Sequence, residues 1–206
     1  NNAAQNYSGN EGWQVIAQPN LPLLMVNIPS TPQRQQLVMH AQTGAWATFT
    51  GLDAYCFARV GSQLYFATST TVMRITGVND NGANITATLI QAYSRLGISR
   101  TKQVVEVKPY FATSGNFTFT LGVLSDFNSL VQGSTIQISS LGSLPLWGSA
   151  IWGSAVWAGS TTNIQDWRGV ADGFSSHKAL YLQVVSNSGT VSYYGADLLA
   201  LPGGNF

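Results

Sequence analysis

The sequence QVVEVKPYFATSGNFTFTLGVL, residues 103–124, decides the fold class of this chain. In its second half, one face of an extended chain carries apolar side chains: Phe117, Phe119, Leu121 and Val123. The other face carries small or polar residues: Thr118, Thr120 and Gly122. This period of two is typical of a half-buried strand. Residues 113–116, Thr-Ser-Gly-Asn, separate 103–111 from 116–124 and predict an antiparallel hairpin of the two longest strands.

Short strand-like runs lie on both sides of this pair, and glycine-containing turns separate many of them. The runs are 13–17, 37–42, 45–50, 54–60, 63–68, 72–76, 85–93, 136–138, 179–185 and 190–199. Gly61-Ser62 and Asn79-Asp80-Asn81-Gly82 have the composition of tight turns. Helix signals are nearly absent. Short strands at this spacing predict an all-β fold of antiparallel sheets, as a sandwich, a barrel or a propeller blade.

The first thirty residues differ from the rest. Residues 1–12 are polar and rich in turn formers, and the apolar run 21–28 contains Pro22. A proline within a strand favours an edge position, so we expect an edge strand or a docked extended arm here. The chain begins at Asn1 without a methionine, which predicts a fragment or a processed product.

A tryptophan-rich stretch, PLWGSAIWGSAVW at residues 145–157, holds three of the six tryptophans. Trp147, Trp152 and Trp157 are spaced by five, which is neither the period of a strand nor that of a helix. We expect an extended, glycine-kinked arm, residues 145–158, whose indoles anchor in this domain's own core or in a neighbouring subunit. Trp167 is grouped with them as a further anchor.

The composition argues against a free cytosolic enzyme. Charged residues make up only 8% of the 206 residues, against about 25% in an average soluble domain. Such a surface suits a protein that remains in contact with other subunits or lies outside the cytosol. The net charge is +1, so no overall basic field recruits nucleic acid. No apolar run approaches the ~18 residues of a membrane-spanning helix.

One local group of cations stands out: Arg95, Arg100, Lys102 and Lys108. Only Glu106 opposes it, and the alternatives are a solvated strand edge and a surface that contacts DNA or a partner protein. Cys56, the single cysteine, excludes an internal disulfide and a cysteine-based zinc site.

Residues for catalysis are few, with two histidines and eight carboxylates. His40 lies in a strand and His177 in a loop, no nucleophile-elbow or nucleotide-binding motif occurs, and Asp166 and Asp172 are the one suggestive carboxylate pair. We expect no catalytic site, no metal site and no cofactor.

Several motifs nevertheless fall into one pattern. They are Trp46 with 51–57, 64–67, 79–82 with Ile85, Lys102 with 104–110, the tryptophan repeat, Trp167-Arg168-Gly169 and Gly203-Gly204. Over residues 37–206 the chain resembles the C-terminal part of the tail hub or nozzle protein of short-tailed phages, also called a packaged-DNA stabilisation protein.

The resemblance implies a non-enzymatic virion subunit, assembled in the host cytoplasm into a ring, sixfold in the family. The ring sits below the portal and adaptor proteins at the head-to-tail junction, and retains and conducts double-stranded DNA without sequence preference. It also implies a β-sandwich-like platform, residues 93–206, and a partial β-propeller-like portion, residues 31–92. Residues 1–30, before these parts, are expected to form an extended lead-in arm. The alternative is a carbohydrate-binding or adhesin module of a tail spike or secreted protein, because exposed indoles stack on sugar rings.

Overall fold

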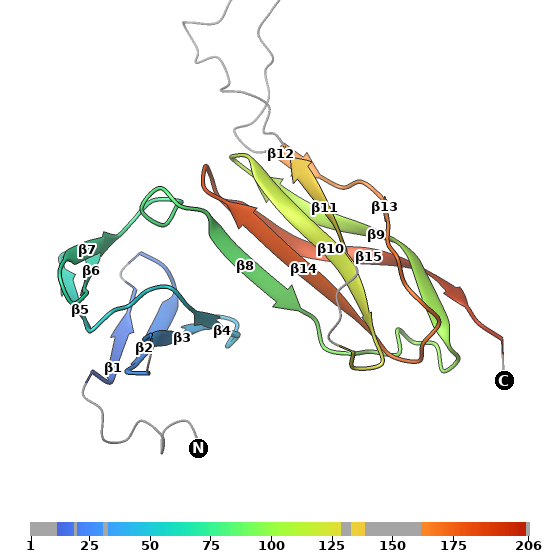
Figure 1. Ribbon diagram of the computed structural model, residues 1–206, viewed down its shortest axis with the longest axis horizontal. Coiled ribbons are helices and arrows are strands. Elements are labelled where there is room, and N and C mark those ends of the chain that lie inside the picture. The colour runs from blue at the N-terminus through green and yellow to red at the C-terminus, as the bar shows by residue number, and fades with distance from the viewer. Residues whose placement is uncertain (1–11, 19, 31–32, 129–132, 139–161, 205–206) are drawn as a thin grey trace, which may run out of the picture. The chain divides into compact units, whose positions relative to one another are not determined.

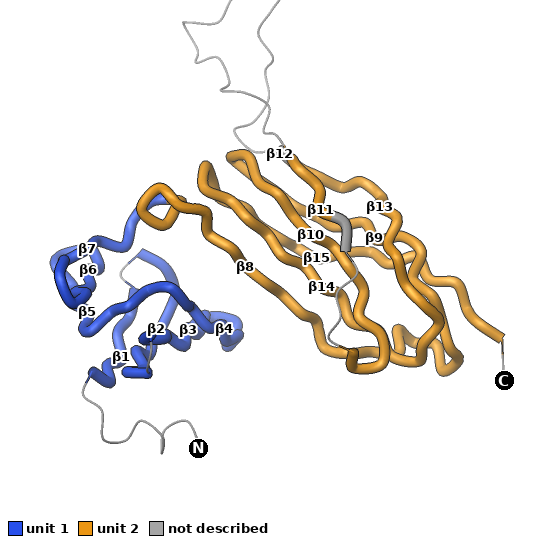
Figure 2. The backbone as a smooth tube through the Cα atoms, viewed as in Figure 1, with its two compact units in different colours: residues 1–77 blue, residues 78–206 orange. Residues whose placement is uncertain are grey.

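The computed structural model describes residues 12–18, 20–30, 33–128, 133–138 and 162–204. Every regular element among them is a β-strand, and all strand pairs are antiparallel, which confirms the predicted all-β fold. The chain divides into two compact units, residues 1–77 and 78–206 (Figure 2). This single division differs from the expected boundaries after residues 30 and 92.

Unit 1 consists of two antiparallel meanders (Figure 1). The first runs in the order β1 (Gln14–Ala17), β2 (Leu23–Ile28), β3 (Gln35–His40) and β4 (Trp46–Phe49). The second contains β5 (Cys56–Val60), β6 (Gln63–Ala67) and β7 (Val72–Ile75). Side chains from both share one core: Met25, Val38, Ala54, Phe57, Leu64 and Phe66. Meanders of this kind are the units from which propeller blades are built.

The segment with Pro22 is not an edge strand. Strand β2 begins at Leu23, after the proline, and pairs with β1 on one side and β3 on the other. A proline just before a strand removes no hydrogen bond from the ladder. The edge-strand prediction is therefore wrong, and residues 14–28 belong to the sheet and not to a lead-in arm.

A row of amide side chains joins the two meanders. Gln14, Asn27 and Gln36 are cross-strand partners on β1, β2 and β3, so their side chains share one face of the sheet. Each binds backbone groups of the segment 52–57 at 2.6–2.9 Å. Gln36 also donates to the Asn27 side chain at 2.9 Å. The row supplies hydrogen bonds to a stretch of chain that would otherwise bury unpaired backbone groups.

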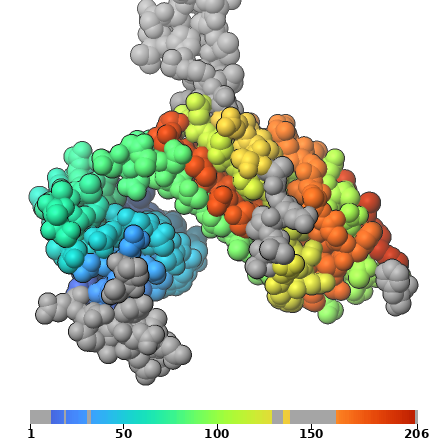
Figure 3. Space-filling model, in the orientation of Figure 1, coloured from blue at the N-terminus to red at the C-terminus, as the bar shows by residue number. Residues whose placement is uncertain are grey.

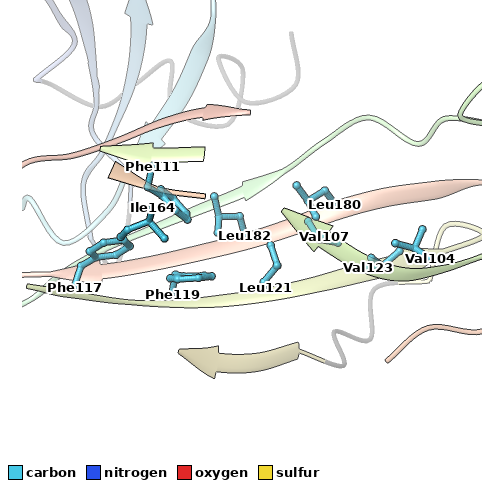
Figure 4. Close-up of a cluster of buried hydrophobic side chains, with 10 residues drawn as sticks. All are labelled: Val104, Val107, Phe111, Phe117, Phe119, Leu121, Val123, Ile164, Leu180 and Leu182. Atoms are coloured by element: carbon cyan, nitrogen blue, oxygen red, sulfur yellow. The ribbon is translucent and has the colours of Figure 1, made fainter. Parts of the chain in front are cut away.

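Unit 2 is a sandwich of two sheets. The first has the order β11 (Gly133–Ile138), β10 (Phe117–Ser125), β14 (Lys178–Ser186) and β8 (Ile85–Ile90). In the second, β9 (Lys102–Thr113) pairs with β15 (Val191–Pro202) on one side and with β12 (Thr162–Ile164) and β13 (Arg168–Gly169) on the other. The core between them, drawn in Figure 4, contains Val104, Val107, Phe111, Phe117, Phe119, Leu121, Val123, Ile164, Leu180 and Leu182.

The predicted hairpin of 103–111 with 116–124 is wrong. Strand β9 pairs with β15 and β10 pairs with β14, so the loop 114–116 crosses from one sheet to the other as a β-arch. The ring centroids of Phe111 on β9 and Phe119 on β10 lie 5.0 Å apart across the interior. Both strands have one apolar face, and stacking them in facing sheets buries both faces.

The β14–β15 connection is a second arch lying against the first, because β14 pairs with β10 and β15 pairs with β9. A Cβ atom on Gly115 would lie 2.4 Å from the carbonyl oxygen of Ser188, and one on Gly189 would lie 2.5 Å from the Gly115 nitrogen. Only glycine permits this approach of two backbones. The predicted turn at Gly61-Ser62, in contrast, is confirmed as the two-residue loop between the paired strands β5 and β6.

Pro109 interrupts the second sheet without breaking it. Strand β13 pairs with residues 106–107 of β9 and β12 pairs with 111–113, so neither strand reaches the position opposite the proline. Because proline has no N–H to donate, a gap in the partner strand at this point costs no hydrogen bond.

Candidate functional site

The end of the sandwich away from the arches carries a buried ion pair. Nζ of Lys178, on β14, lies 2.6 Å from Oδ2 of Asp172, and both side chains are only 1% exposed. Ser125, at the end of β10, donates to Asp172 at 2.8 Å and accepts from Lys178 at 2.8 Å. The Val104 amide donates to Asp172, and Lys178 also donates to the carbonyl of Gly173. The whole polar cluster is therefore hydrogen-bonded.

This arrangement fastens the loop before β14 to the ends of β9 and β10. A catalytic serine needs a neighbouring base that accepts its proton. Here the Ser125 hydroxyl already donates to Asp172, and Lys178 is held by the same carboxylate. Buried and fully paired, the three residues have the chemistry of a structural ion pair. The sequence analysis paired Asp172 with Asp166, whereas in the structure its partner is Lys178.

Lys102 does not lie on the surface. Its side chain is 0% exposed, and Nζ donates to the carbonyl of Ser176 at 2.6 Å. Burial, and then the positive charges of Lys178 and Arg95, lower the pKa of Lys102 below its ordinary value. The hypothesis that Lys102 contacts DNA or a partner is contradicted, because the residue has no surface exposed to solvent.

Beside the ion pair, a strained turn presents an aromatic ring to solvent. Asp126 and Phe127 both have positive φ, 44° and 64°, and the turn closes with the Asn128 amide donating to the Ser125 carbonyl at 2.9 Å. Positive φ is rare for a bulky residue. Asp126 holds the turn, since its Oδ1 accepts the amides of Ser176 and His177 at 3.1 and 2.9 Å. These backbone donors, that of His177 first, lower the pKa of Asp126.

Phe127 belongs to a small surface cluster, which we call the aromatic patch: Tyr93, Arg95, Phe127 and His177. The Phe127 ring is 69% exposed, 4.5 Å from the ring of Tyr93 and 5.4 Å from that of His177. Arg95 lies in the same group, with its Nε donating to His177 Nε2 at 3.3 Å. Arg95 was predicted from the sequence, whereas the strained turn that presents Phe127 leaves no sequence signal.

The other predicted cations do not gather with Arg95. Lys108 lies six residues beyond Lys102 on β9, roughly 20 Å along a strand. Its Nζ is 5.3 Å from the centroid of the Tyr110 ring, and its cross-strand partner is Asp197. The Tyr110 hydroxyl donates to Asp197, which raises the pKa of Tyr110. Arg100 is exposed. The structure therefore divides the group into a buried lysine, a lysine opposite a carboxylate and two surface arginines.

Trp167 is 46% exposed, so it is not an anchor in the core of this chain. Its other predicted role, as an anchor in a subunit interface, stays a prediction. Trp147, Trp152 and Trp157 lie outside the described residues. No cluster of three metal-ligating side chains occurs in the described ranges. Nor does any helix there have the length and apolar character to cross a membrane.

No protein-family model matches the chain, and no curated protein matches it.

Proposed function

We propose that this chain is a non-enzymatic structural subunit of a phage virion, in the tail nozzle or hub at the head-to-tail junction. It associates into a ring that binds the portal and adaptor proteins and retains and conducts the genome. The sequence motifs of residues 37–206 support the proposal. One structural observation carries its self-association: large apolar side chains are exposed on both units while few charged residues are available to keep a monomer soluble.

The exposed apolar residues come from many strands. The most exposed are Tyr194, Val72, Phe127, Val60, Val15 and Trp46, with 58–74% of each surface accessible. Single exposed apolar residues are normal on a monomer. This chain has many such residues and only 8% charged residues. That combination favours protein–protein contact, because the cores of interfaces are poor in charged residues and rich in aromatic side chains.

The positions of the four predicted cations are compatible with a channel that conducts DNA without binding it tightly. Every phosphate that a protein neutralises adds salt-dependent affinity. Lys102 is buried and Lys108 lies opposite Asp197, which leaves Arg95 and Arg100 for transient phosphate contact. A ring of such subunits carries few cations in total.

Solution mass measured by light scattering, together with negative-stain images, tests this function. We expect a closed ring, six subunits by the family resemblance, and weak DNA binding that salt abolishes. A chain that stays monomeric in these measurements contradicts the proposal.

The aromatic patch favours a second candidate, a carbohydrate-binding or adhesin module. The exposed face of Phe127 beside Arg95 and His177 offers a ring for stacking and polar groups for hydroxyls. Binding of a glycan by the monomer, lost in Phe127→Ala and kept in the control Phe174→Ala, decides for this candidate. Phe174 is a matched control because it is 57% exposed in the same unit.

A further inference from the structure

The sandwich has two open edges on one side. Among the described residues, β8 pairs only with β14, and β15 pairs only with β9. The two arches place β10 opposite β9 and β14 opposite β15. Strands β12 and β13 extend the second sheet beside β9, as β11 extends the first beside β10. Within unit 2, strand β8 therefore projects one strand beyond β15, and no other described strand of this unit lies opposite it.

The uncovered face of β8 is its core face. Leu89 is the cross-strand partner of Leu182, a core residue that is 2% exposed, so the two side chains share a face. Ile85 and Ala87 lie on that face too, at the period of two. Leu89 nevertheless remains 41% exposed and Ile85 47%. The space-filling view shows the green segment that contains β8 beside its partner, the orange-red β14 (Figure 3).

These features define a notch: the free backbone edge of β15 below and the apolar residues Ile85, Ala87 and Leu89 of β8 above. One strand placed in it would continue the second sheet from β15 and cover β8. Strand β8 has six residues and no charge, so a strand of similar length without charges fits. A free backbone edge beside an uncharged apolar strand is a ready template for pairing with another chain.

We propose that the notch takes a β-strand from the segment 145–157 of a second copy of this chain. The inference rests on the self-association in the proposed function. The segment is free of charge, as is the whole stretch 127–165, and it contains three tryptophans, a residue type that is enriched in strands. It is also long enough to supply six residues in strand form together with its two connections.

The position of the segment 145–157, the strand donor, indicates that the strand comes from a second copy of the chain. The described strands that flank the segment, β11 and β12, form the edge of the sandwich opposite β8 and β15. Copies placed side by side therefore bring the donor of one to the notch of the next. Such a contact joins two different surfaces, head to tail, and repeats to give a ring when the rotation closes.

Two full-length variants test separately the notch and the segment 145–157 that donates the strand. Leu89→Lys puts a charge into the notch at a side chain that is 41% exposed in the single chain. Thr86→Lys is its matched control, since Thr86 is exposed on the opposite face of β8. In the donor variant, a Gly-Ser linker of equal length replaces residues 145–157. We expect Leu89→Lys and the donor variant each to weaken association by at least about tenfold, and Thr86→Lys to associate like the unmodified chain.

Mixing the two weakened variants is the decisive measurement. The Leu89→Lys chain retains a donor and the linker chain retains a notch, so together they should form a one-to-one complex and nothing larger. Light scattering and native mass spectrometry measure this directly. No complex on mixing, or full assembly by Leu89→Lys alone, overturns the proposal, as does a cross-link between the donor and the notch of one monomer.

These outcomes distinguish this inference from the proposed function. Full assembly by Leu89→Lys leaves the self-association standing and removes only the notch. A one-to-one complex of the variants, with open filaments from the unmodified chain, retains the notch and removes the ring.

Discussion

The two units differ in the chemistry of the polar side chains that they bury. Each buries polar side chains next to its apolar core: unit 1 uses the neutral amides Asn27 and Gln36, and unit 2 uses the ion pair of Lys178 with Asp172. A neutral amide gives a modest net gain for each hydrogen bond, and its loss costs one or two unpaired groups. A buried charge depends wholly on its partner. Unit 1 should therefore tolerate changes in its polar interior far better than unit 2.

The largest effect is expected at Asp172. Asp172→Ala leaves the buried Lys178 ammonium without its counter-ion, and should reduce the free energy of unfolding of unit 2 by about 3–5 kcal/mol. Urea unfolding measures it. In the double variant Asp172→Leu/Lys178→Met no unpaired charge remains, so the loss should be clearly smaller; an equal loss would contradict the assignment to the charge.

A smaller effect is expected at Asn27 in unit 1. Asn27→Ala removes the donor to the Ala54 carbonyl and the acceptor for Gln36, and should cost about 1–3 kcal/mol. Hydrogen exchange of residues 23–40 localises the loss to unit 1. Gln35→Ala, an exposed neighbour on the same strand, should leave the exchange unchanged. Equal effects of both variants would remove the amide row as the cause.

The pH dependence of unit 2 should reflect Lys102. Its folded pKa is lowered below the ordinary 10.5, so burial of the charged lysine costs stability at neutral pH. As the pH rises through the lowered pKa towards 10.5, the unfolded chain holds more protons and stability should increase. The Lys102→Met variant should lose this slope in thermal unfolding between neutral pH and the onset of tyrosine ionisation near 10. If stability depends on pH equally in the Lys102→Met variant, another group causes the dependence.

The smallest effect is expected at the exposed ion pair of unit 1. Arg34 Nη1 lies 3.3 Å from Asp53 Oδ1, and the two side chains are 21% and 45% exposed. Water and salt screen this pair, so Asp53→Asn should cost less than about 1 kcal/mol. Urea unfolding beside Asp172→Ala gives the comparison. A loss as large as that at Asp172 would show that burial does not separate the two pairs.

Much of the local structure follows from the sequence. The alternation at 116–124 predicts β10, and Leu64 and Phe66 are buried on β6 as their period of two predicts. The loop at Gly61-Ser62 and the turn at 79–82, closed by the bridge of Asp80 with Ala83, lie where Gly and Asn place them. These features depend on residues close together in the chain, which is why one sequence is enough to find them.

The pairing of the strands was decided only by the tertiary structure. Alternation shows which face of β9 or β10 is apolar, but a hairpin and an arch bury that face equally well. The choice rests on contacts across long distances in the sequence, such as the approach of Gly115 to Ser188. The same holds for Lys102 and for Asp172 with Lys178: charged residue types predict exposure, and only the completed fold supplies the partners that let them be buried.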